Sequence, residues 1–173
     1  MDAQQGVVVV RKESPADVEA IRALHTTSFP TAAEAELVDA LRSAGRLSIS
    51  LVAVEGDSVI GHVGFSPVTV DGEPLGLGLA PVAVRFDCRQ RGVAAQLIRA
   101  GLELCRQAAA GVVVVLGNPR YYSRFGFESG EHHRLRDEYR GGDAFQAIEL
   151  VQGSLPAGGG LVRYAAEFAA VGV

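Results

Sequence analysis

The stretch from Leu79 to Ile98 constrains this chain more than any other part of it. An apolar run over residues 79–84 is typical of a strand, a short polar segment follows, and helical spacing of apolar residues begins at Gly92. The first turn of such a helix presents backbone N–H groups that have no partner in the helix, together with the positive end of the helix dipole. This arrangement predicts an anion-binding site.

The residues around this helix start suit a phosphate. Gly92 and the small side chains of Ala94 and Ala95 let an anion approach the backbone, and Arg89 and Arg91 add positive charge. The nucleotide-binding motifs GxGxxG and GxxxxGK[ST] are absent. The alternative is that the arginines are solvated loop charges and that the glycine serves only a turn.

The composition narrows the class of protein. The chain has 173 residues, of which 48% are hydrophobic and 21% charged, and its formal net charge is -4. These values predict one packed domain over residues 1–173. The acidic balance argues against a nucleic-acid partner, and the longest apolar run, residues 112–116, is too short to span a bilayer. No N-terminal segment combines a basic start, an apolar core and a small-residue cleavage site, so we expect a cytoplasmic protein without a membrane partner.

Periodicity and turn signals predict an α/β protein with a mixed sheet. Strands are expected at residues 7–10, 48–55, 58–66, 68–70, 75–84, 112–116, 144–150 and 161–165, and helices from Ser14, over 32–43, from Gly92 and over 118–124. The β-branched run at 7–10 predicts a strand buried on both faces. Residues 129–143 show no clear pattern, and the glycine- and proline-rich residues 152–160 are expected to be loosely structured.

Several segments resemble the GNAT superfamily of N-acetyltransferases. The spacing Arg89-x-x-Gly92-x-Ala94 is similar to the family motif Q/R-x-x-G-x-G/A, in which alanine is allowed at the last position. Residues 79–84 look like the family's fourth strand, and residues 121–127 resemble its Tyr-x-x-x-Gly-Phe signature. Within the superfamily, the YhbS-like acetyltransferases are the subgroup that the sequence resembles at Gly-His-Val-Gly-Phe-Ser (61–66) and Leu-Gly-Asn-Pro-Arg-Tyr-Tyr (116–122).

The resemblance covers most of residues 7–168 and implies both a fold and a ligand. The implied fold is α+β: a mostly antiparallel sheet with helices on both faces and with parallel fourth and fifth strands that splay apart. The implied ligand is acetyl-CoA, the acyl donor, with its pyrophosphate on the amides of residues 91–95 and its pantetheine beside the fourth strand. The residues implied to bind it are Val82, Ala83, Val84, Arg89, Gln90, Arg91, Gly92, Val93, Ala94, Ala95, Asn118, Tyr122 and Arg124.

The implied reaction is direct attack of an amine on the thioester, which needs an acid and a base. Tyr122 stands where the resemblance places the general acid, and a phenol of pKa about 10 suits a thiolate leaving group of pKa about 8.5. The main-chain N–H of Val82 or Val84 would polarise the thioester carbonyl. The predicted fourth strand lacks the acidic residue that many family members carry there. The candidate bases are Glu34, Glu36 and His62, or a water chain leading to them.

Each of these residues also has a simpler interpretation. Tyr122 is a candidate core residue, because buried tyrosines commonly satisfy their hydroxyl locally. His62 is a candidate buried histidine, and both acids are candidate helix-surface residues. Arg124 would meet either the 3′-phosphate of CoA or solvent.

No metal is expected from the sequence. The adjacent His132 and His133 are expected to diverge and to lack a third ligand nearby. The two cysteines, Cys88 and Cys105, lack metal-ligand spacing and are expected to be reduced thiols.

The expected function is therefore acetyl transfer from acetyl-CoA to a primary amine. A non-catalytic acyl-CoA sensor that regulates a partner is the alternative. The sequence leaves the acceptor open between a small molecule, a peptide N-terminus and a protein lysine. It also leaves the acyl-chain preference open, and the oligomeric state between a monomer and a homodimer through the C-terminal strands.

Overall fold

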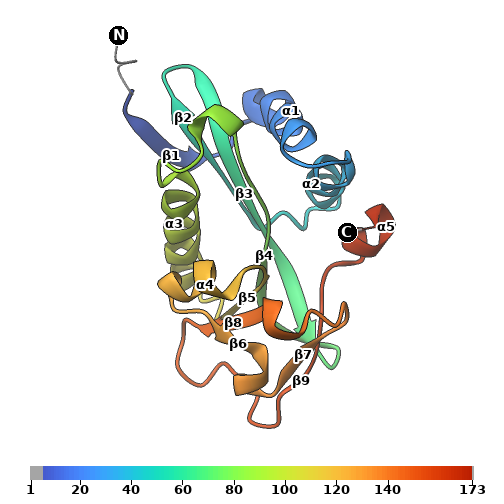
Figure 1. The fold of residues 1–173 in the computed structure, drawn as a ribbon. Helices are drawn as coiled ribbons and strands as arrows, with labels where there is room; N and C mark the ends of the chain where they lie inside the picture. Colours follow the sequence, from blue (N-terminus) through green and yellow to red (C-terminus); the bar gives the residue numbers. More distant parts are fainter. Residues whose placement is uncertain (1–5, 173) are drawn as a thin grey trace.

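A computed structural model describes residues 6–172 (Figure 1). Its strands are β1 (Val8–Lys12), β2 (Ile49–Glu55), β3 (Ser58–Val70), β4 (Glu73–Val84), β5 (Val112–Leu116), β6 (Glu128–Ser129), β7 (Leu135–Asp137), β8 (Phe145–Glu149) and β9 (Gly160–Arg163). Its α-helices are α1 (Val18–Ser28), α2 (Ala33–Ser43), α3 (Val93–Gln107), α4 (Pro119–Tyr122) and α5 (Ala166–Val171). Within residues 6–172, no helix is long and apolar enough to cross a membrane.

The strands form one mixed sheet in the order β1-β2-β3-β4-β5-β8-β6, and β9 joins the far end of β3. Most neighbours are antiparallel, whereas β4 and β5 are parallel and pair only at Leu77↔Val113 and Gly78↔Val114. From residue 79 onward, β4 has no strand partner among the described residues on the side that faces β5, whereas it stays paired with β3 on the other side. The predicted mixed sheet with splayed fourth and fifth strands is confirmed.

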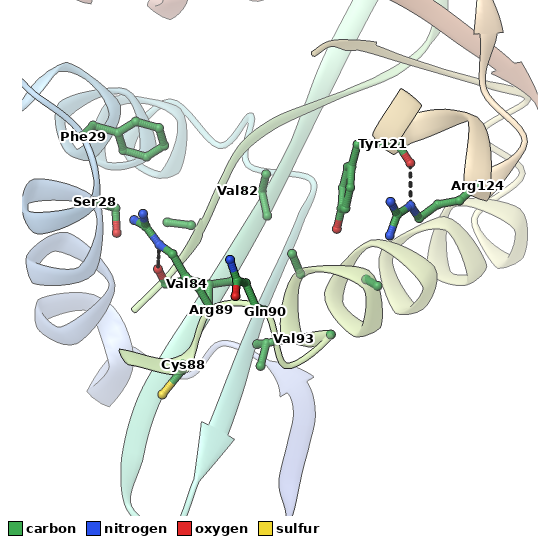
Figure 2. Close-up of a pocket in the computed structure, with 14 residues that line it drawn as sticks. Ser28, Phe29, Val82, Val84, Cys88, Arg89, Gln90, Val93, Tyr121 and Arg124 are labelled. Carbon is green, nitrogen blue, oxygen red and sulfur yellow. Dashed lines mark hydrogen bonds between the residues drawn. The ribbon is translucent and has the colours of Figure 1, made fainter. Parts of the chain in front are cut away.

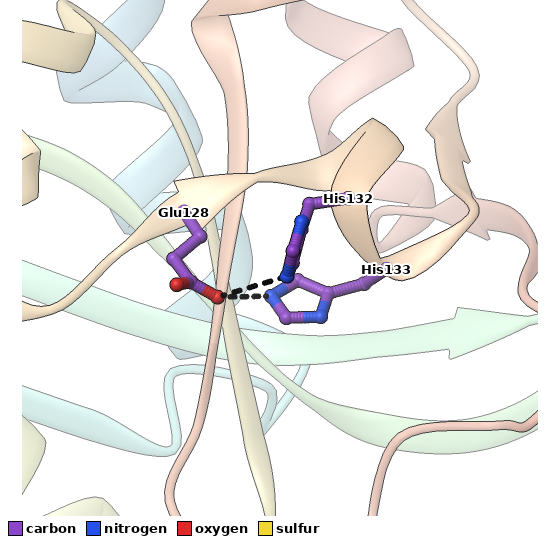
Figure 3. A group of neighbouring side chains, drawn as sticks. All are labelled: Glu128, His132 and His133. Atoms are coloured by element: carbon purple, nitrogen blue, oxygen red, sulfur yellow. Dashed lines mark ion pairs between the residues drawn. The ribbon is translucent and has the colours of Figure 1, made fainter.

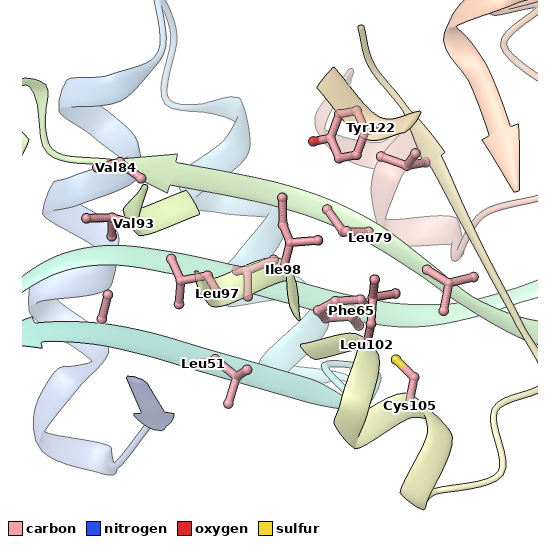
Figure 4. Close-up of a cluster of buried hydrophobic side chains, with 14 of the residues drawn as sticks. Leu51, Phe65, Leu79, Val84, Val93, Leu97, Ile98, Leu102, Cys105 and Tyr122 are labelled. Atoms are coloured by element: carbon pink, nitrogen blue, oxygen red, sulfur yellow. The ribbon is translucent and has the colours of Figure 1, made fainter. Parts of the chain in front are cut away.

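Helix α3 covers one face of the sheet because its apolar residues recur at helical spacing. Leu97, Ile98 and Leu102 are at most 3% exposed and pack on the ring of Phe65, from β3 (Figure 4). The same cluster extends along the sheet to Tyr122 in α4. The core beneath α3 therefore fixes both the start of α3 and the position of α4.

Helices α1 and α2 cover the opposite face. Val52 in β2 contacts Ile21 from α1 and Val38 from α2, whereas its neighbour Leu51 faces the α3 side. This alternation is what a strand buried on both faces requires. The predicted arrangement of helices on both faces is thus confirmed (Figure 1).

Two strand predictions need correction. The first strand is not buried on both faces: β1 is an edge strand that pairs only with β2 among the described residues, and Val9 is 54% exposed. The separate strands predicted at 58–66 and 68–70 form one strand, β3. Pro67 is tolerated because it lies between the part of β3 that pairs with β2 and the part that pairs with β9.

The region after α4 contains more structure than the sequence predicts. β6, β7 and α5 fall outside the predicted elements, and the strand predicted at 161–165 is observed as β9, at 160–163. β7 pairs in parallel with β9, although residues 138–159 separate the two strands in the sequence. Strands of two or three residues carry no readable alternation, so only tertiary pairing defines them.

Candidate active site

Helix α3 begins directly after Gly92, whose φ of 76° lies in the left-handed region. A Cβ at this position would meet nothing within 4 Å, so the backbone conformation, and not a lack of space, favours glycine here. No side chain in the described structure caps α3, and the N–H groups of its first turn are therefore free to bind a ligand. The helix start has the geometry that anion binding requires.

A cavity of about 630 Å³, here called the helix-end cavity, opens at this point between β4 and α3. Its lining combines the unpaired part of β4, the loop and first turn of α3, the end of α1, and α4 with the residues after it. The lining residues are Ser28, Phe29, Val82, Ala83, Val84, Cys88, Arg89, Gln90, Gly92, Val93, Ala94, Ala95, Tyr121 and Arg124. Most residues that the sequence assigned to the acyl donor therefore line one cavity.

Two arginines stand on opposite sides of the helix-end cavity (Figure 2). Arg89 donates from Nε to the carbonyl oxygen of Val84 at 3.0 Å, and its guanidinium lies over the ring of Phe86. Arg124 donates from Nε to the carbonyl oxygen of Tyr121 at 2.9 Å and lies 4.3 Å from the centroid of that ring. Because neither arginine has a carboxylate partner in the described structure, each keeps donors for an anionic ligand.

Two residues of the predicted donor site have other partners. The Arg91 guanidinium donates to Glu55, with Nη2 2.6 Å from Oε1, and this hydrogen bond lowers the pKa of Glu55. Asn118 uses its side-chain oxygen to accept the N–H of Arg120 at 2.9 Å, which caps α4. The charge of Arg91 is thus compensated within the protein, and the side chain of Asn118 has a structural partner.

A second cavity, of about 410 Å³, adjoins the first and shares Phe29 and Val82 with it. We call it the tyrosine cavity, because three tyrosines line it. The remaining lining is largely apolar with one acidic residue. The complete lining is Phe29, Glu34, Leu37, Leu79, Ala80, Pro81, Val82, Leu116, Tyr122, Tyr139, Tyr164 and Phe168.

Tyr122 is held firmly in the wall of the tyrosine cavity. Its ring packs edge-on against Phe127 with centroids 5.7 Å apart, and its side chain belongs to the core under α3. Gly117 faces the ring so closely that a Cβ there would lie 2.3 Å from a ring carbon, so only glycine permits this approach. Burial raises the pKa of Tyr122 to about 12. The hydroxyl therefore stays protonated at neutral pH.

Glu34 lies in the same cavity as Tyr122, as one candidate role requires. Its Oε2 atom is buried and makes no hydrogen bond to the described residues, and the same holds for the hydroxyl of Tyr164. Unpartnered buried polar atoms are costly, and because these two residues line a cavity, they are candidate contacts for a ligand. Glu36, the other acidic candidate, is exposed on α2.

His62 is a residue of β3 whose side chain is fully buried against α1, and it lines neither cavity. Its Nδ1 lies 2.8 Å from Nε2 of His25, and its Nε2 lies 2.8 Å from the hydroxyl of Ser50. Burial holds the pKa of His62 well below its usual range. The geometry matches the sequence alternative in which His62 is a hydrogen-bonded core residue.

Sequence reasoning missed most residues of the tyrosine cavity, among them Phe29, Tyr139 and Tyr164. Each comes from a segment distant in sequence from the glycine loop, which comprises residues 85–92 between β4 and α3, and only the tertiary fold brings them together. The one available signal was the aromatic character of residues otherwise placed in loops or a terminal strand.

Comparison with known families matches residues 9–130 to the acetyltransferase (GNAT) domain. The matched residues include β4, the glycine loop, α3 and the Tyr-x-x-x-Gly-Phe signature. The chain therefore belongs to the GNAT acetyltransferase family.

Individual relatives place the chain more narrowly within the family. It is 44% identical to the uncharacterized N-acetyltransferase YhbS of Escherichia coli strain K12 over 164 residues. This match covers 93% of this chain and 98% of that protein. The crystal structure of Escherichia coli YhbS in complex with CoA matches with a TM-score of 0.91 and 42% identity, over 98% of this chain and 95% of that one. A GNAT family acetyltransferase from Brucella melitensis in complex with acetyl-CoA matches with a TM-score of 0.80 and 37% identity, over 94% and 98% of the two chains. The resemblance to YhbS-like acetyltransferases is confirmed.

Proposed function

We propose that the protein transfers an acetyl group from acetyl-CoA to a primary amine by direct attack of the amine on the thioester. The junction of the two cavities at Phe29 and Val82 carries this proposal. The helix-end cavity offers groups for an anionic donor, and the tyrosine cavity offers an acid and a carboxylate for the acceptor. CoA and acetyl-CoA in the structures of the Escherichia coli and Brucella melitensis relatives support the choice of donor.

The lining of the helix-end cavity offers partners for both the phosphates and the pantetheine of acetyl-CoA. The amides of residues 91–95 receive the pyrophosphate at the positive end of α3, and Arg89 adds a charge-assisted hydrogen bond. The part of β4 from Val82 to Val84, which lacks a strand partner on this side, offers main-chain groups to the pantetheine amides. Arg124, on the opposite side, is the candidate contact of the 3′-phosphate.

When bound, acetyl-CoA supplies the thioester carbon that the amine attacks. The N–H of Val82 or Val84 stabilises negative charge developing on the thioester oxygen. A C–N bond forms and the C–S bond breaks, and Tyr122 gives its hydroxyl proton to the departing sulfur. Since Tyr122 is protonated at neutral pH, it is ready to act as this acid.

Glu34 takes the proton that the amine loses. Its buried Oε2 lacks a partner among the described residues and lines the cavity that holds Tyr122, so a cationic or neutral amine would satisfy it. Among the described residues, His62 forms side-chain hydrogen bonds only with His25 and Ser50, and it has no direct role in this scheme. Glu34 then releases its proton to solvent and Tyr122 regains one from solvent, so that both groups return to their starting states.

The shape of the tyrosine cavity points to an amine with an apolar body. A volume of about 410 Å³ holds a small molecule or one extended side chain. Leu37, Leu116 and Phe168 offer apolar surface, and Tyr164 offers an unpartnered hydroxyl. The acceptor class that fits best is a small primary amine carrying an aliphatic or aromatic group.

Amine-dependent release of free CoA thiol from acetyl-CoA tests the proposed function. A panel of aliphatic, aromatic and strongly polar primary amines is compared at saturating acetyl-CoA. We expect thiol release that saturates with amine concentration and favours the apolar amines. Binding of acetyl-CoA without release for any amine would instead support the non-catalytic sensor.

Arg89→Ala is expected to weaken acetyl-CoA binding about 10- to 100-fold, because it removes a charge-assisted hydrogen bond to the ligand. Arg91→Ala is the matched control. Arg91 lies two positions further along the loop but is neutralised by Glu55, so its loss should change the affinity by less than about threefold. Calorimetric titration of acetyl-CoA and dephospho-CoA measures both variants. Equal weakening by the two changes would contradict the assignment.

Glu34→Gln is expected to lower kcat/KM for the amine about 100-fold, because the neutral amide cannot accept the proton. The affinity for acetyl-CoA should be retained, since Glu34 does not line the helix-end cavity. Glu36→Gln, on the exposed side of α2, serves as the control and should behave as the parent. Steady-state rates over a range of amine concentrations distinguish the outcomes. An unchanged rate in Glu34→Gln would leave a water chain as the base.

A further inference from the structure

Three side chains of the kinds that ligate metals converge at the turn between β6 and β7. Glu128 is in β6, and His132 and His133 end the short 3-10 helix Gly130–His133 that follows it. One oxygen of Glu128, Oε2, lies 3.2 Å from Nε2 of His133 and 3.8 Å from Nε2 of His132. Figure 3 shows both rings directed at this oxygen. The three donor atoms all lie within 4.8 Å of one another.

The sequence argument that these histidines diverge and lack a third ligand is therefore wrong. Adjacent side chains do point apart in a strand, but the tight turn places both rings on the side of Glu128. The ring centroids are 5.1 Å apart and the rings are nearly perpendicular, so their Nε2 atoms approach one point from two directions.

The spacing of the donor atoms suits a small divalent cation. A tetrahedral zinc ion with ligand bonds of about 2.0–2.1 Å holds neighbouring ligand atoms about 3.3 Å apart. The two N···O separations in the cluster bracket this value. Side-chain rotations that draw the three atoms from within 4.8 Å of one another to about this separation would bring all of them into the coordination shell of one ion.

The hydrogen bonding of His133 gives an independent reason to expect a ligand. Its Nε2 atom is buried and forms no hydrogen bond of good geometry with the described residues, although the side chain as a whole is 14% exposed. A neutral imidazole nitrogen presents a lone pair to a metal. Glu128 and His132 are exposed, so solvent reaches the cluster and leaves a route for the ion.

We propose that Glu128, His132 and His133 bind one zinc ion, with water in the fourth position. Two imidazoles and one carboxylate favour zinc over calcium and magnesium, which prefer oxygen ligands. The site is separate from the two cavities, because none of the three residues lines either of them.

The position of this site defines its effect on the protein. Bound zinc links β6 to the turn that leads into β7, and Asp137 at the end of β7 accepts the N–H groups of Tyr139 and Gly141. Tyr139 lines the tyrosine cavity. Zinc therefore stabilises the segment that carries one wall of that cavity.

Zinc titration of chelator-treated protein without an affinity tag tests the proposal. Calorimetry should give one zinc per chain, and the unfolding temperature should rise with zinc concentration. His132→Ala and Glu128→Gln each remove a ligand at an exposed position, so folding is preserved, and each should weaken zinc binding about tenfold or more. Glu131→Gln, an exposed acid in the same turn, is the control and should bind zinc as the parent does.

Two outcomes would overturn the proposal: absence of saturable zinc binding, or equal affinity in the parent and both ligand variants. Cobalt substitution separates this site from the thiols of Cys88 and Cys105. The bound cobalt should show ligand-field absorption without a sulfur-to-metal charge-transfer band. Because no readout depends on turnover, the result is independent of the proposed acetyl transfer.

Discussion

Tyr122→Phe is expected to lower kcat about 100- to 1000-fold while acetyl-CoA binds with unchanged affinity. The loss follows from removal of the proton donor for the departing thiolate, and general acid catalysis contributes a factor of this size. The ring itself is retained, so its packing against Gly117 and Phe127 is preserved. Single-turnover rates with saturating acetyl-CoA and amine, combined with calorimetric binding, separate chemistry from affinity.

Tyr121→Phe is the matched control for this prediction. Tyr121 is adjacent in the chain and lines the helix-end cavity, and phenylalanine keeps the ring on which Arg124 lies. Its kcat should stay within about threefold of the parent, since no step of the proposed chemistry uses its hydroxyl. A large loss in Tyr121→Phe with little loss in Tyr122→Phe would reverse the assignment of the acid.

The pH dependence of the rate provides a second check on Tyr122. Burial raises its pKa to about 12, above the ordinary value of 10. The protonated, active form therefore persists as the pH rises, and deprotonation of this acid should not lower kcat below about pH 10. A rate that falls through neutral pH would require another group as the acid.

Local signals in the sequence predicted the part of the site around the helix-end cavity. Gly92 marks a left-handed residue before a helix, and the apolar run before it marks a buried strand, so both elements follow from neighbouring residues. The order of the main strands and helices followed in the same way. Resemblance to the GNAT family then supplied the splay of β4 and β5, which no local pattern indicates.

The remaining features depend on contacts between distant segments. The partner of Arg91 is Glu55, in β2, and the sequence alone cannot distinguish this arginine from Arg89, which has no carboxylate partner among the described residues. The tyrosine cavity likewise draws Glu34 from α2 and Tyr164 from the chain after β9. Short-range periodicity carries no information on such pairs, because it records only which face of an element is buried.

Lowering the pH from 8 to 5 is expected to destabilise the protein through the buried pair His25 and His62. Burial lowers the pKa of His25 to about 4, with a further contribution from Arg42, against an opposing one from Asp39. The pKa of His62 is also depressed by burial. Because protonation favours the unfolded chain, the stability is complete above the ordinary histidine pKa of 6.5 and falls as the pH decreases toward 4.

The size of this effect follows from the shift at His25. A change in pKa from 6.5 to about 4 corresponds to a total contribution of roughly 3 kcal/mol to the free energy of unfolding. Roughly 2 kcal/mol of this contribution is lost when the pH falls to 5. The lowered pKa of Asp17, beside Arg11, affects stability only below its ordinary value of 3.8, so this ion pair does not interfere in the range measured. Urea unfolding at 25 °C between pH 8 and pH 5 measures the free energy of unfolding directly.

The double variant His25→Leu/His62→Leu tests the origin of the pH dependence. Replacing both partners by apolar residues leaves neither imidazole of this pair to titrate, whereas a single replacement would strand a polar nitrogen beside the other ring. Its free energy of unfolding should therefore vary with pH much less than that of the parent over pH 5–8. If the double variant kept the full slope, the titrating groups would have to lie elsewhere, and the neutral, hydrogen-bonded state of this pair would not be what makes the fold acid-sensitive.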